Sequence, residues 1–390
     1  MAPRSFSSPP RPIVVGDVVV AYSDALGEWT AGQITGIDGD WKKVDVLDLN
    51  WSGPEPTSLL DLGDLAPLRL THHSWKDKLS HCHFNWVLPR SHKVIGNQPL
   101  LRTQGSNSYG SAWRLGLQLA LQRSWDGGNR DSWEDPGARR FSDEDFRHEV
   151  GGRPGSDGEV YDVEITVVDT LDCSRVVAAY PGLKRLTLHG KLGTLTNAES
   201  LNRLAALQRL SISDLFGMTS MDRITPENIP HLEALSLSSV PAEYATAMRA
   251  TWRTEIPNGT DVDIREPRKP NWVAENRDNP LRDWDGREHI STARFKKAVA
   301  QYKTTRRAVL AELRAPETAD QLSKLFSLGR EYGEAFNHMD RRNSFIETVE
   351  REELFDALAG TVKTAEEELG RDLTQAGEHL IKGLESIRDW

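Results

Sequence analysis

The sequence repeats one phrase three times, as Leu183-Lys-Arg-Leu-Thr-Leu188, Leu207-Gln-Arg-Leu-Ser-Ile212 and Leu232-Glu-Ala-Leu-Ser-Leu237. The copies begin 24 and 25 residues apart, counting from 183 to 207 and from 207 to 232. Alternating apolar residues predict a short strand in each copy, because successive strand side chains point to opposite faces. No copy can bury its apolar face alone, so the strands are expected to stack around a shared core.

At this spacing, the phrase L-x-x-L-x-L resembles the leucine-rich-repeat family, in which one repeat takes about 20 to 29 residues. Fainter copies flank it at Val160-Tyr-Asp-Val-Glu-Ile165 and Val262-Asp-Ile264, and terminal repeats are expected to be atypical because they cap the stack. The resemblance implies a short solenoid over residues 159–266 that binds protein on its concave face. The alternative is that the repeats only brace neighbouring domains.

The residues between the leucines of each copy are expected to line the concave face in parallel columns. This face is small and polar, with arginines at its centre. The partner-binding residues are therefore expected to be Arg185, Thr187, His189, Arg209, Ser211, Ser213 and Ser236.

Residues 13–95 contain short β-type runs separated by turn residues, which favour a small barrel. The order Gly16-Asp17-Val18-Val19-Val20-Ala21, Trp29-Thr-Ala-Gly-Gln-Ile34 and Val44-Asp-Val46-Leu-Asp48 resembles a Tudor or SH3-like barrel, a fold that commonly binds peptides or nucleic acid. Aromatic residues of this segment are candidates for a cage that attracts a cation through the ring quadrupoles. They are Tyr22, Trp29, Trp41 and Trp51. The alternative places Trp29 in the core.

Composition divides the rest of the chain. Residues 1–12, with four prolines, predict a disordered tail. Residues 96–158 predict a helical segment and a Gly-rich linker, residues 267–290 a second linker, and residues 291–390 an α-helical domain. The predicted fold class is thus multi-domain α/β, with a small SH3-like β-barrel, a short leucine-rich-repeat solenoid and a C-terminal α-helical bundle.

The first helix of the C-terminal domain is expected to have two distinct stripes. One is apolar and consists of Phe295, Val299, Tyr302, Val309 and Leu313. The other is a basic contact stripe of Lys296, Lys303, Arg307 and Arg314. A later helix is rich in glutamate, including Glu347 and Glu350, which we expect to be solvated. The basic and acidic helices either pair within the bundle or offer an electrostatic docking surface.

Six candidate metal ligands fall within 21 residues, at His72, His73, His81, Cys82, His83 and His92. Their spacing matches no standard zinc pattern, and strand alternation would turn His81 and His83 away from Cys82. The phosphate-binding, dinucleotide-binding and nucleophile-elbow motifs are missing, and His189, Ser213 and Asp214 form no more than a chance triad. The sequence therefore predicts neither a metal site nor a cofactor, and no catalytic residues.

The formal net charge of -10 argues against a chain that binds nucleic acid non-specifically over its whole surface. Two cysteines are too few for a disulfide framework, and no stretch approaches the roughly 20 apolar residues that cross a bilayer. We therefore expect a cytoplasmic protein with no membrane partner.

These observations favour a protein–protein interaction adaptor or regulator that is not an enzyme and binds a protein partner through the repeat face. A nucleic-acid-binding regulator using the barrel and the basic stripe is the first alternative. A zinc-dependent enzyme built on the histidine cluster is the second. By analogy alone, the domain arrangement also suits a protein of defence or immunity.

Overall fold

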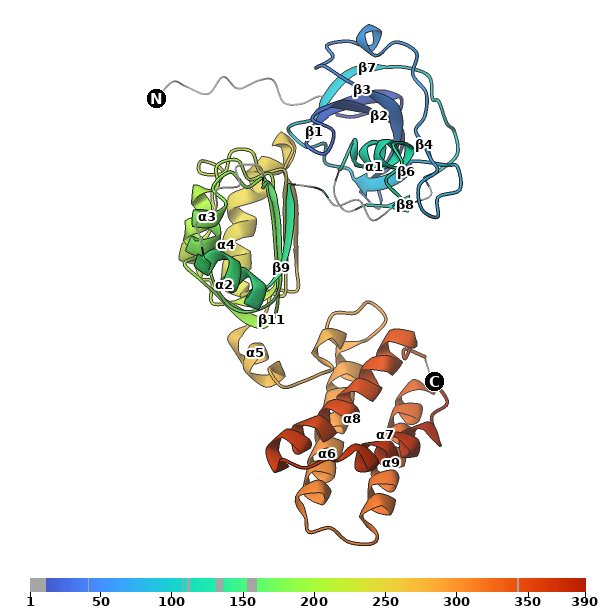
Figure 1. The fold of residues 1–390 in the computed structure, drawn as a ribbon, viewed down its shortest axis with the longest axis vertical. Helices are drawn as coiled ribbons and strands as arrows, with labels where there is room; N and C mark the ends of the chain where they lie inside the picture. The colour runs from blue at the N-terminus through green and yellow to red at the C-terminus, as the bar shows by residue number, and fades with distance from the viewer. Residues whose placement is uncertain are drawn as a thin grey trace. The chain divides into compact units, whose positions relative to one another are not determined.

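The structure is a computed structural model that describes residues 12–40, 42–106, 108–110, 113–130, 135, 137–152, 160–341 and 344–390. Residues 1–11 of the predicted tail lie outside that part of the chain. The chain divides into two compact units, Met1–Lys269 and Pro270–Trp390. The first unit holds an antiparallel and a parallel sheet and the second holds helices (Figure 1), which confirms the mixed α/β class.

The N-terminal sheet has six strands in the order β7-β1-β2-β3-β6-β8, and all neighbours are antiparallel except β6 and β8. In β1, which lies between β7 and β2, Val19 and Ala21 pack in one apolar cluster, while Val18 and Val20 pack in another. Both faces of this strand are thus buried, which explains its unbroken apolar run. The strands are β1 (Asp17–Ser23), β2 (Glu28–Asp38), β3 (Lys43–Gly53), β6 (His81–Asn85), β7 (Lys93–Asn97) and β8 (Ser108–Tyr109).

Smaller elements accompany this sheet. The short helix η1 spans Leu59–Leu62, β4 (Arg69–Leu70) pairs with β5 (Lys78–Leu79), and α1 spans Leu117–Asp126. Leu119 of α1 packs with the buried Leu68 and Leu70. This contact fixes α1 against the segment around β4.

The second sheet of the first unit is parallel, with the order β14-β13-β12-β11-β10-β9. Its inward leucines, isoleucines and valines form one core with the helices that cover one face (Figure 1). The strands are β9 (Ala138–Ser142), β10 (Asp162–Asp172), β11 (Arg185–Thr196), β12 (Arg209–Phe216), β13 (Ala234–Ser238) and β14 (Asp261–Arg265). The connecting helices are α2 (Asp143–Gly152), α3 (Cys173–Ala179), η2 (Ala198–Arg203), η3 (Ser220–Asp222), α4 (Ala242–Trp252) and η4 (Arg253–Asn258).

Strand register confirms the predicted outward columns. Arg185 lies beside Arg209, which lies beside Ala234, and Thr187 lies beside Ser211. The next column joins His189 and Ser213. The alternating leucines set this register, because a slip of one residue would expose all of them.

Residues 96–158, expected to be a helical segment and a Gly-rich linker, also contain a strand of the parallel sheet. Strand β9 is part of the parallel sheet and pairs with β10, and α2 follows it directly. The sequence of β9 contains one large apolar residue, Phe141, which packs edge-to-face on the buried Phe146 of α2. A strand with a single core residue shows no alternation, so the pattern could not identify it.

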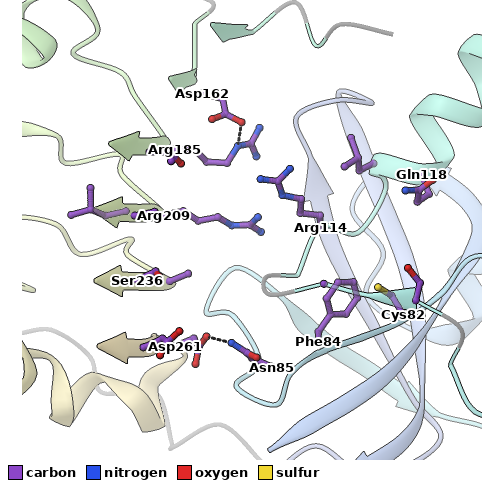
Figure 2. Close-up of a pocket in the computed structure, with 18 of the residues that line it drawn as sticks. Cys82, Phe84, Asn85, Arg114, Gln118, Asp162, Arg185, Arg209, Ser236 and Asp261 are labelled. Carbon is purple, nitrogen blue, oxygen red and sulfur yellow. Dashed lines mark hydrogen bonds and ion pairs between the residues drawn. The ribbon is translucent and has the colours of Figure 1, made fainter. Parts of the chain in front are cut away.

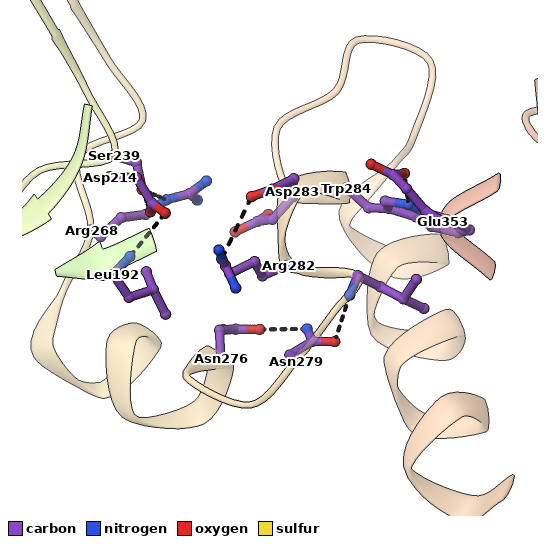
Figure 3. A network of polar contacts seen from close by, with 12 residues as sticks. Leu192, Asp214, Ser239, Arg268, Asn276, Asn279, Arg282, Asp283, Trp284 and Glu353 are labelled. Atoms are coloured by element: carbon purple, nitrogen blue, oxygen red, sulfur yellow. Dashed lines mark hydrogen bonds and ion pairs between the residues drawn. The ribbon is translucent and has the colours of Figure 1, made fainter. Parts of the chain in front are cut away.

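Several of the parallel strands share a left-handed backbone position that no sequence pattern predicts. Two positions after the core residues Ile165, Ile212, Leu237 and Ile264, the chain adopts a left-handed conformation at Val167, Asp214, Ser239 and Glu266, with φ of 55°, 53°, 52° and 50°. Asp214 supports this turn, since its carboxylate accepts hydrogen bonds from Leu192 N at 3.0 Å and from the Ser239 hydroxyl at 3.2 Å (Figure 3).

The described residues of the second unit form six helical segments. They are α5 (Pro270–Asn276), η5 (Arg282–Trp284), α6 (Thr292–Arg314), α7 (Gln321–Asp340), α8 (Thr348–Leu369) and α9 (Thr374–Glu385). The apolar stripe predicted on α6 is buried in the core of this unit, as expected from its helical spacing. Although residues 267–290 were predicted to be a linker, Leu281 and Trp284 are fully buried in this core. Figure 3 shows Trp284, whose indole N–H donates to Glu353 at 2.8 Å.

Helices α7 and α9 approach each other through glycines. A side-chain carbon added at Gly329 would overlap the carbonyl oxygen of Leu380, and one added at Gly383 would overlap the carbonyl oxygen of Phe326. The two backbones are therefore in direct contact, which only residues without a side chain permit.

Within the described residues, the helices are all too short or too polar to span a lipid bilayer.

Candidate functional site

A cleft lies in the first unit between the N-terminal sheet and the outward face of the parallel sheet (Figure 2). It consists of two cavities of about 630 and 750 Å³. Both cavities are lined by the same central residues, which are Arg114, Leu117, Asp162, Arg185 and Arg209. The three arginines, called here the arginine cluster, therefore lie where the two cavities meet.

Polar contacts join the two sheets that form the walls of the cleft. Asn85 donates to Asp261 at 2.5 Å, and the Ser91 N–H donates to Glu233 at 2.9 Å. Arg90 donates to the carbonyl oxygen of Pro230 at 2.6 Å and pairs with Glu255. Each contact joins the loop or strand end of one sheet to that of the other, so the cleft is a built feature of the unit.

Members of the arginine cluster differ in how well they are paired. Arg185 bonds Asp162 at 2.9 Å and lies 3.6 Å from Asp24. One terminal nitrogen of Arg209 donates to the carbonyl oxygen of Trp113, while the other, Nη1, is shielded from water and has no hydrogen-bond partner among the described residues. The exposed Arg114 forms no ion pair with any described residue. Two guanidinium groups thus retain unused hydrogen-bond donors.

The positive charges in the cluster oppose one another. Burial, together with the neighbouring charges of Arg114 and Arg185, lowers the pKa of the Arg209 guanidinium to about 10. Arg209 is still charged at neutral pH, so the electrostatic repulsion among the three guanidinium groups remains. Figure 2 shows Arg185 and Arg209 reaching from the parallel strands toward Arg114 on the opposite wall. An anion placed between them would offset this repulsion.

The N-terminal sheet contributes a buried carboxylate to the cleft. Asp48 of β3 is 7% exposed and accepts a hydrogen bond from the Ser80 hydroxyl at 2.6 Å, while its other oxygen, Oδ1, has no hydrogen-bond partner in the described part of the chain. Burial raises the pKa of Asp48 to about 7, against the weaker opposing effect of Ser80. Both residues line the 630 Å³ cavity with the arginine cluster.

Replacing Asp48 by asparagine is expected to change how stability depends on pH. Because the pKa is higher in the folded protein than the ordinary 3.8, folding binds a proton, and stability falls as pH rises from about 4 to about 7. Asp48→Asn removes this loss. We therefore expect the free energy of unfolding of the variant to exceed that of the wild type by up to about 4 kcal/mol at pH 8, and by much less at pH 4. Urea unfolding at both pH values measures the difference. A difference independent of pH would contradict the assignment.

Five of the seven predicted partner-binding residues line the cleft, and two do not. Those in the cleft are Arg185, Thr187, Arg209, Ser211 and Ser236. Outside it, His189 Nδ1 and the Ser213 hydroxyl lie 2.7 Å apart. The neighbouring Asp214 accepts hydrogen bonds from the Leu192 N–H and the Ser239 hydroxyl.

Sequence reasoning missed Arg114 and Asp48. No signal in the chain pointed to Arg114, because only the folded unit brings this residue close to β11 and β12, which begin at residues 185 and 209. For Asp48, the sequence pattern did contain a signal. In the run Val44-Asp-Val46-Leu-Asp48, alternation places this aspartate on the same face as two buried valines. A charged residue at a core-facing position is a candidate functional group.

The predicted aromatic cage is only partly described, because Trp41 lies outside the described residues. Tyr22 is exposed and meets the half-buried Trp29 edge-to-face, with ring centroids 6.4 Å apart. The Lys93 ammonium lies 4.9 Å from the centre of the Trp29 ring, and Trp51 packs against the sheet core. One face of Trp29 is thus occupied by a cation of the protein itself.

The histidine-rich segment does not converge on one point. His81 Nε2 lies 2.7 Å from the Thr35 hydroxyl and His83 pairs with Asp45, while Cys82 lines the cleft on the other face of β6. His72 bonds Gln118. Among the described residues no group of three or more His, Cys, Asp or Glu side chains is arranged to hold a metal ion.

The basic stripe of α6 is exposed along its length. Arg314 pairs with Glu368 of α8 at 2.5 Å, whereas Lys303 and Arg307 line a cavity of about 440 Å³ with Glu275 of α5. The acidic helix is not uniformly solvated as predicted, because Glu350 is buried and pairs with Arg287. Part of the charge on these helices therefore serves the packing of this unit.

The cleft thus combines unpaired arginine donors at one place with a buried, half-paired carboxylate at another. Searches of protein-family models, of curated proteins and of solved structures found no match to the chain.

Proposed function

We propose that the protein is a protein-interaction regulator that receives an acidic segment of a partner protein in the cleft. In this proposal the parallel sheet is a short leucine-rich-repeat array, and the N-terminal sheet is an SH3-like module that covers part of the array's face. The observation that carries the proposal is the arginine cluster. Among the described residues the shielded Arg209 Nη1 has no hydrogen-bond partner, and the exposed Arg114 lines the same two cavities.

The chemistry of the guanidinium group supports a carboxylate as the bound group. Its planar fork matches two carboxylate oxygens, and such charge-assisted pairs are about twice as strong as neutral hydrogen bonds. Because Asp162 already compensates Arg185, the free capacity lies with the other two arginines. A glutamate or aspartate side chain reaching Arg114 and Arg209 would satisfy both.

The size of the cleft argues for an extended segment and against a large flat partner surface. The N-terminal sheet covers Thr187, Ser211 and Ser236, which line the 630 Å³ cavity. That volume falls within the range of about 300 to 1,000 Å³ typical of ligand pockets. A few residues of a partner chain would fill it.

We expect Arg114→Gln to weaken the binding of a six-residue glutamate peptide by about 10- to 100-fold, since a hydrogen bond to a charged group contributes about 1.5 to 3 kcal/mol. Arg114 is exposed and unpaired, so its loss should leave the fold intact. Isothermal titration calorimetry at low salt measures the affinity, and a six-residue glutamine peptide controls for charge.

Arg203→Gln is the matched control, because Arg203 is exposed in η2 and does not line the cleft. Equal weakening by both variants would mean that net charge alone attracts the peptide. Unchanged affinity in Arg114→Gln would refute the proposed function.

A further inference from the structure

The 630 Å³ cavity contains a second site with unused bonding capacity besides the arginine cluster. Asp48 lines this cavity, and its Oδ1 is shielded from water without a hydrogen-bond partner among the described residues. On the neighbouring strand β6, His81 Nδ1 is also unpartnered among these residues, but the ring lies on the face of β6 opposite Cys82, against Thr35. Asp48 and His81 come from the paired strands β3 and β6, where Leu47 lies opposite His81. Orphaned polar atoms in a cavity wall are expected where a ligand completes the hydrogen bonds.

Of these two unpartnered atoms, Asp48 Oδ1 has the greater need of a donor or cation from a ligand. Burial lowers the pKa of His81 to about 4, so this ring is neutral at physiological pH and its Nε2 is already engaged by Thr35. The Asp48 side chain accepts one hydrogen bond, from Ser80, and among the described residues no cation compensates the ionised carboxylate. The other titratable neighbour on β6, Cys82, cannot supply positive charge. An external cation would therefore stabilise the ionised form.

The wall between the two polar sites is largely apolar and aromatic. Trp75, Phe84 and Leu117 line the same cavity as Asp48 and Arg114. Phe84 is held in place by stacking on Trp113, with ring centroids 5.5 Å apart. Such a surface accepts the aliphatic stem of a long side chain, which leaves its charged end to reach the polar site.

From this arrangement we infer that the acidic segment also carries a lysine or arginine, whose cationic end binds Asp48 while its acidic group binds the arginine cluster. The cleft is then selective for a zwitterionic segment, with opposite charges separated by an apolar stem. This inference rests on the proposed function, because it assumes that the acidic group enters the cleft. It adds the second specificity element, which rejects segments that are only acidic.

The test uses acetylated and amidated peptides with glutamate at one end, one to six glycines as a spacer and lysine at the other end. Matched peptides carry norleucine or acetyl-lysine in place of lysine, which keeps the stem and removes the charge. With the best spacer, we expect the lysine peptide to bind the full-length protein at least 10-fold more tightly than the norleucine peptide. In Asp48→Asn this difference should disappear, because the isosteric amide carries no charge.

Proton release provides an independent readout. A cation that binds ionised Asp48 displaces its proton, so at pH 6 the binding enthalpy of the lysine peptide should vary with the ionisation enthalpy of the buffer. The enthalpy of the norleucine peptide should not. This comparison is made in the wild-type protein and does not depend on the folding of a variant.

The possible failures are distinguishable. If no glutamate peptide binds, or if Arg114→Gln leaves binding unchanged, the proposed function fails and the inference fails with it. If glutamate peptides bind through Arg114 but lysine and norleucine peptides have equal affinities, only the inference is overturned.

Discussion

Gly329→Val is expected to unfold the helical unit while the parallel sheet stays folded. The added side chain would occupy the space of the Leu380 carbonyl group, and a backbone atom cannot move aside as the end of a side chain can. Overpacking of a core typically costs about 1 to 3 kcal/mol, and a clash between backbones costs more because two whole helices must separate. Most of the stability of a small unit would be lost.

Hydrogen exchange followed by mass spectrometry measures this effect separately in each unit. Peptides from α7 and α9 should lose protection in Gly329→Val, while peptides from β11 and β12 should keep it. Gly360→Ala in α8 is the matched control, because Gly360 is exposed and an added side-chain carbon meets nothing within 4 Å. This control should stabilise α8 by about 1 kcal/mol. Normal protection of α7 in Gly329→Val would disprove the close contact.

Arg287→Met is expected to destabilise the helical unit by about 3 to 5 kcal/mol at neutral pH. The Glu350 side chain is 3% exposed, and Arg287 is its main charged partner. His289 lies 3.2 Å from the same carboxylate, and the Glu347 N–H donates to it at 3.0 Å. Methionine fills the volume of the arginine but leaves a buried carboxylate without its cation.

The pH dependence of this effect follows from the pKa of Glu350. Burial alone would raise this pKa, but the hydrogen bonds from Arg287 and from the Glu347 backbone together bring it below the ordinary 4.5. The pair therefore stabilises the wild type above pH 4.5, and this contribution is lost as pH falls through the lower value of the folded state. In Arg287→Met burial dominates, so the carboxyl group should take up a proton more readily.

Urea unfolding of both proteins at pH 7 and pH 4 should therefore give a difference that shrinks at the lower pH. Arg314→Met is the matched control, because the Arg314–Glu368 pair is about half exposed and should contribute less than about 1 kcal/mol. A loss in Arg287→Met no greater than in this control would show that Glu350 does not need its partner.

The parallel sheet was predictable because its signal is local. Each copy of the repeated phrase carries its own inward leucines, and these fix which residues face outward without knowledge of the rest of the chain. Arg185 and Arg209 were therefore placed beside each other from alternation alone, and the strand register agrees. Strand β9 and the segment around Trp284 gave no such signal, because each contributes only one or two large residues to a core built by other elements.

The cleft was only half predictable for the same reason. Its parallel-sheet wall follows from alternation, but its other wall depends on how the N-terminal sheet packs against it. The contacts that set this packing, such as Asn85 with Asp261, join residues far apart in sequence whose side chains are ordinary surface types. Sequence periodicity says nothing about such pairs, so the shielding of Arg209 and the approach of Arg114 emerged only with the folded unit.

The left-handed positions of the parallel strands have a consequence for engineering. A left-handed backbone costs roughly 1 to 2 kcal/mol for a residue with a side chain, and Val167 is branched at the first carbon, which makes this conformation especially unfavourable. Neither Val167 nor Ser239 lines the cleft. At the exposed Val167, glycine would release this strain and stabilise the sheet without changing the lining of the cleft. Ser239 is less suitable, because its hydroxyl donates to Asp214.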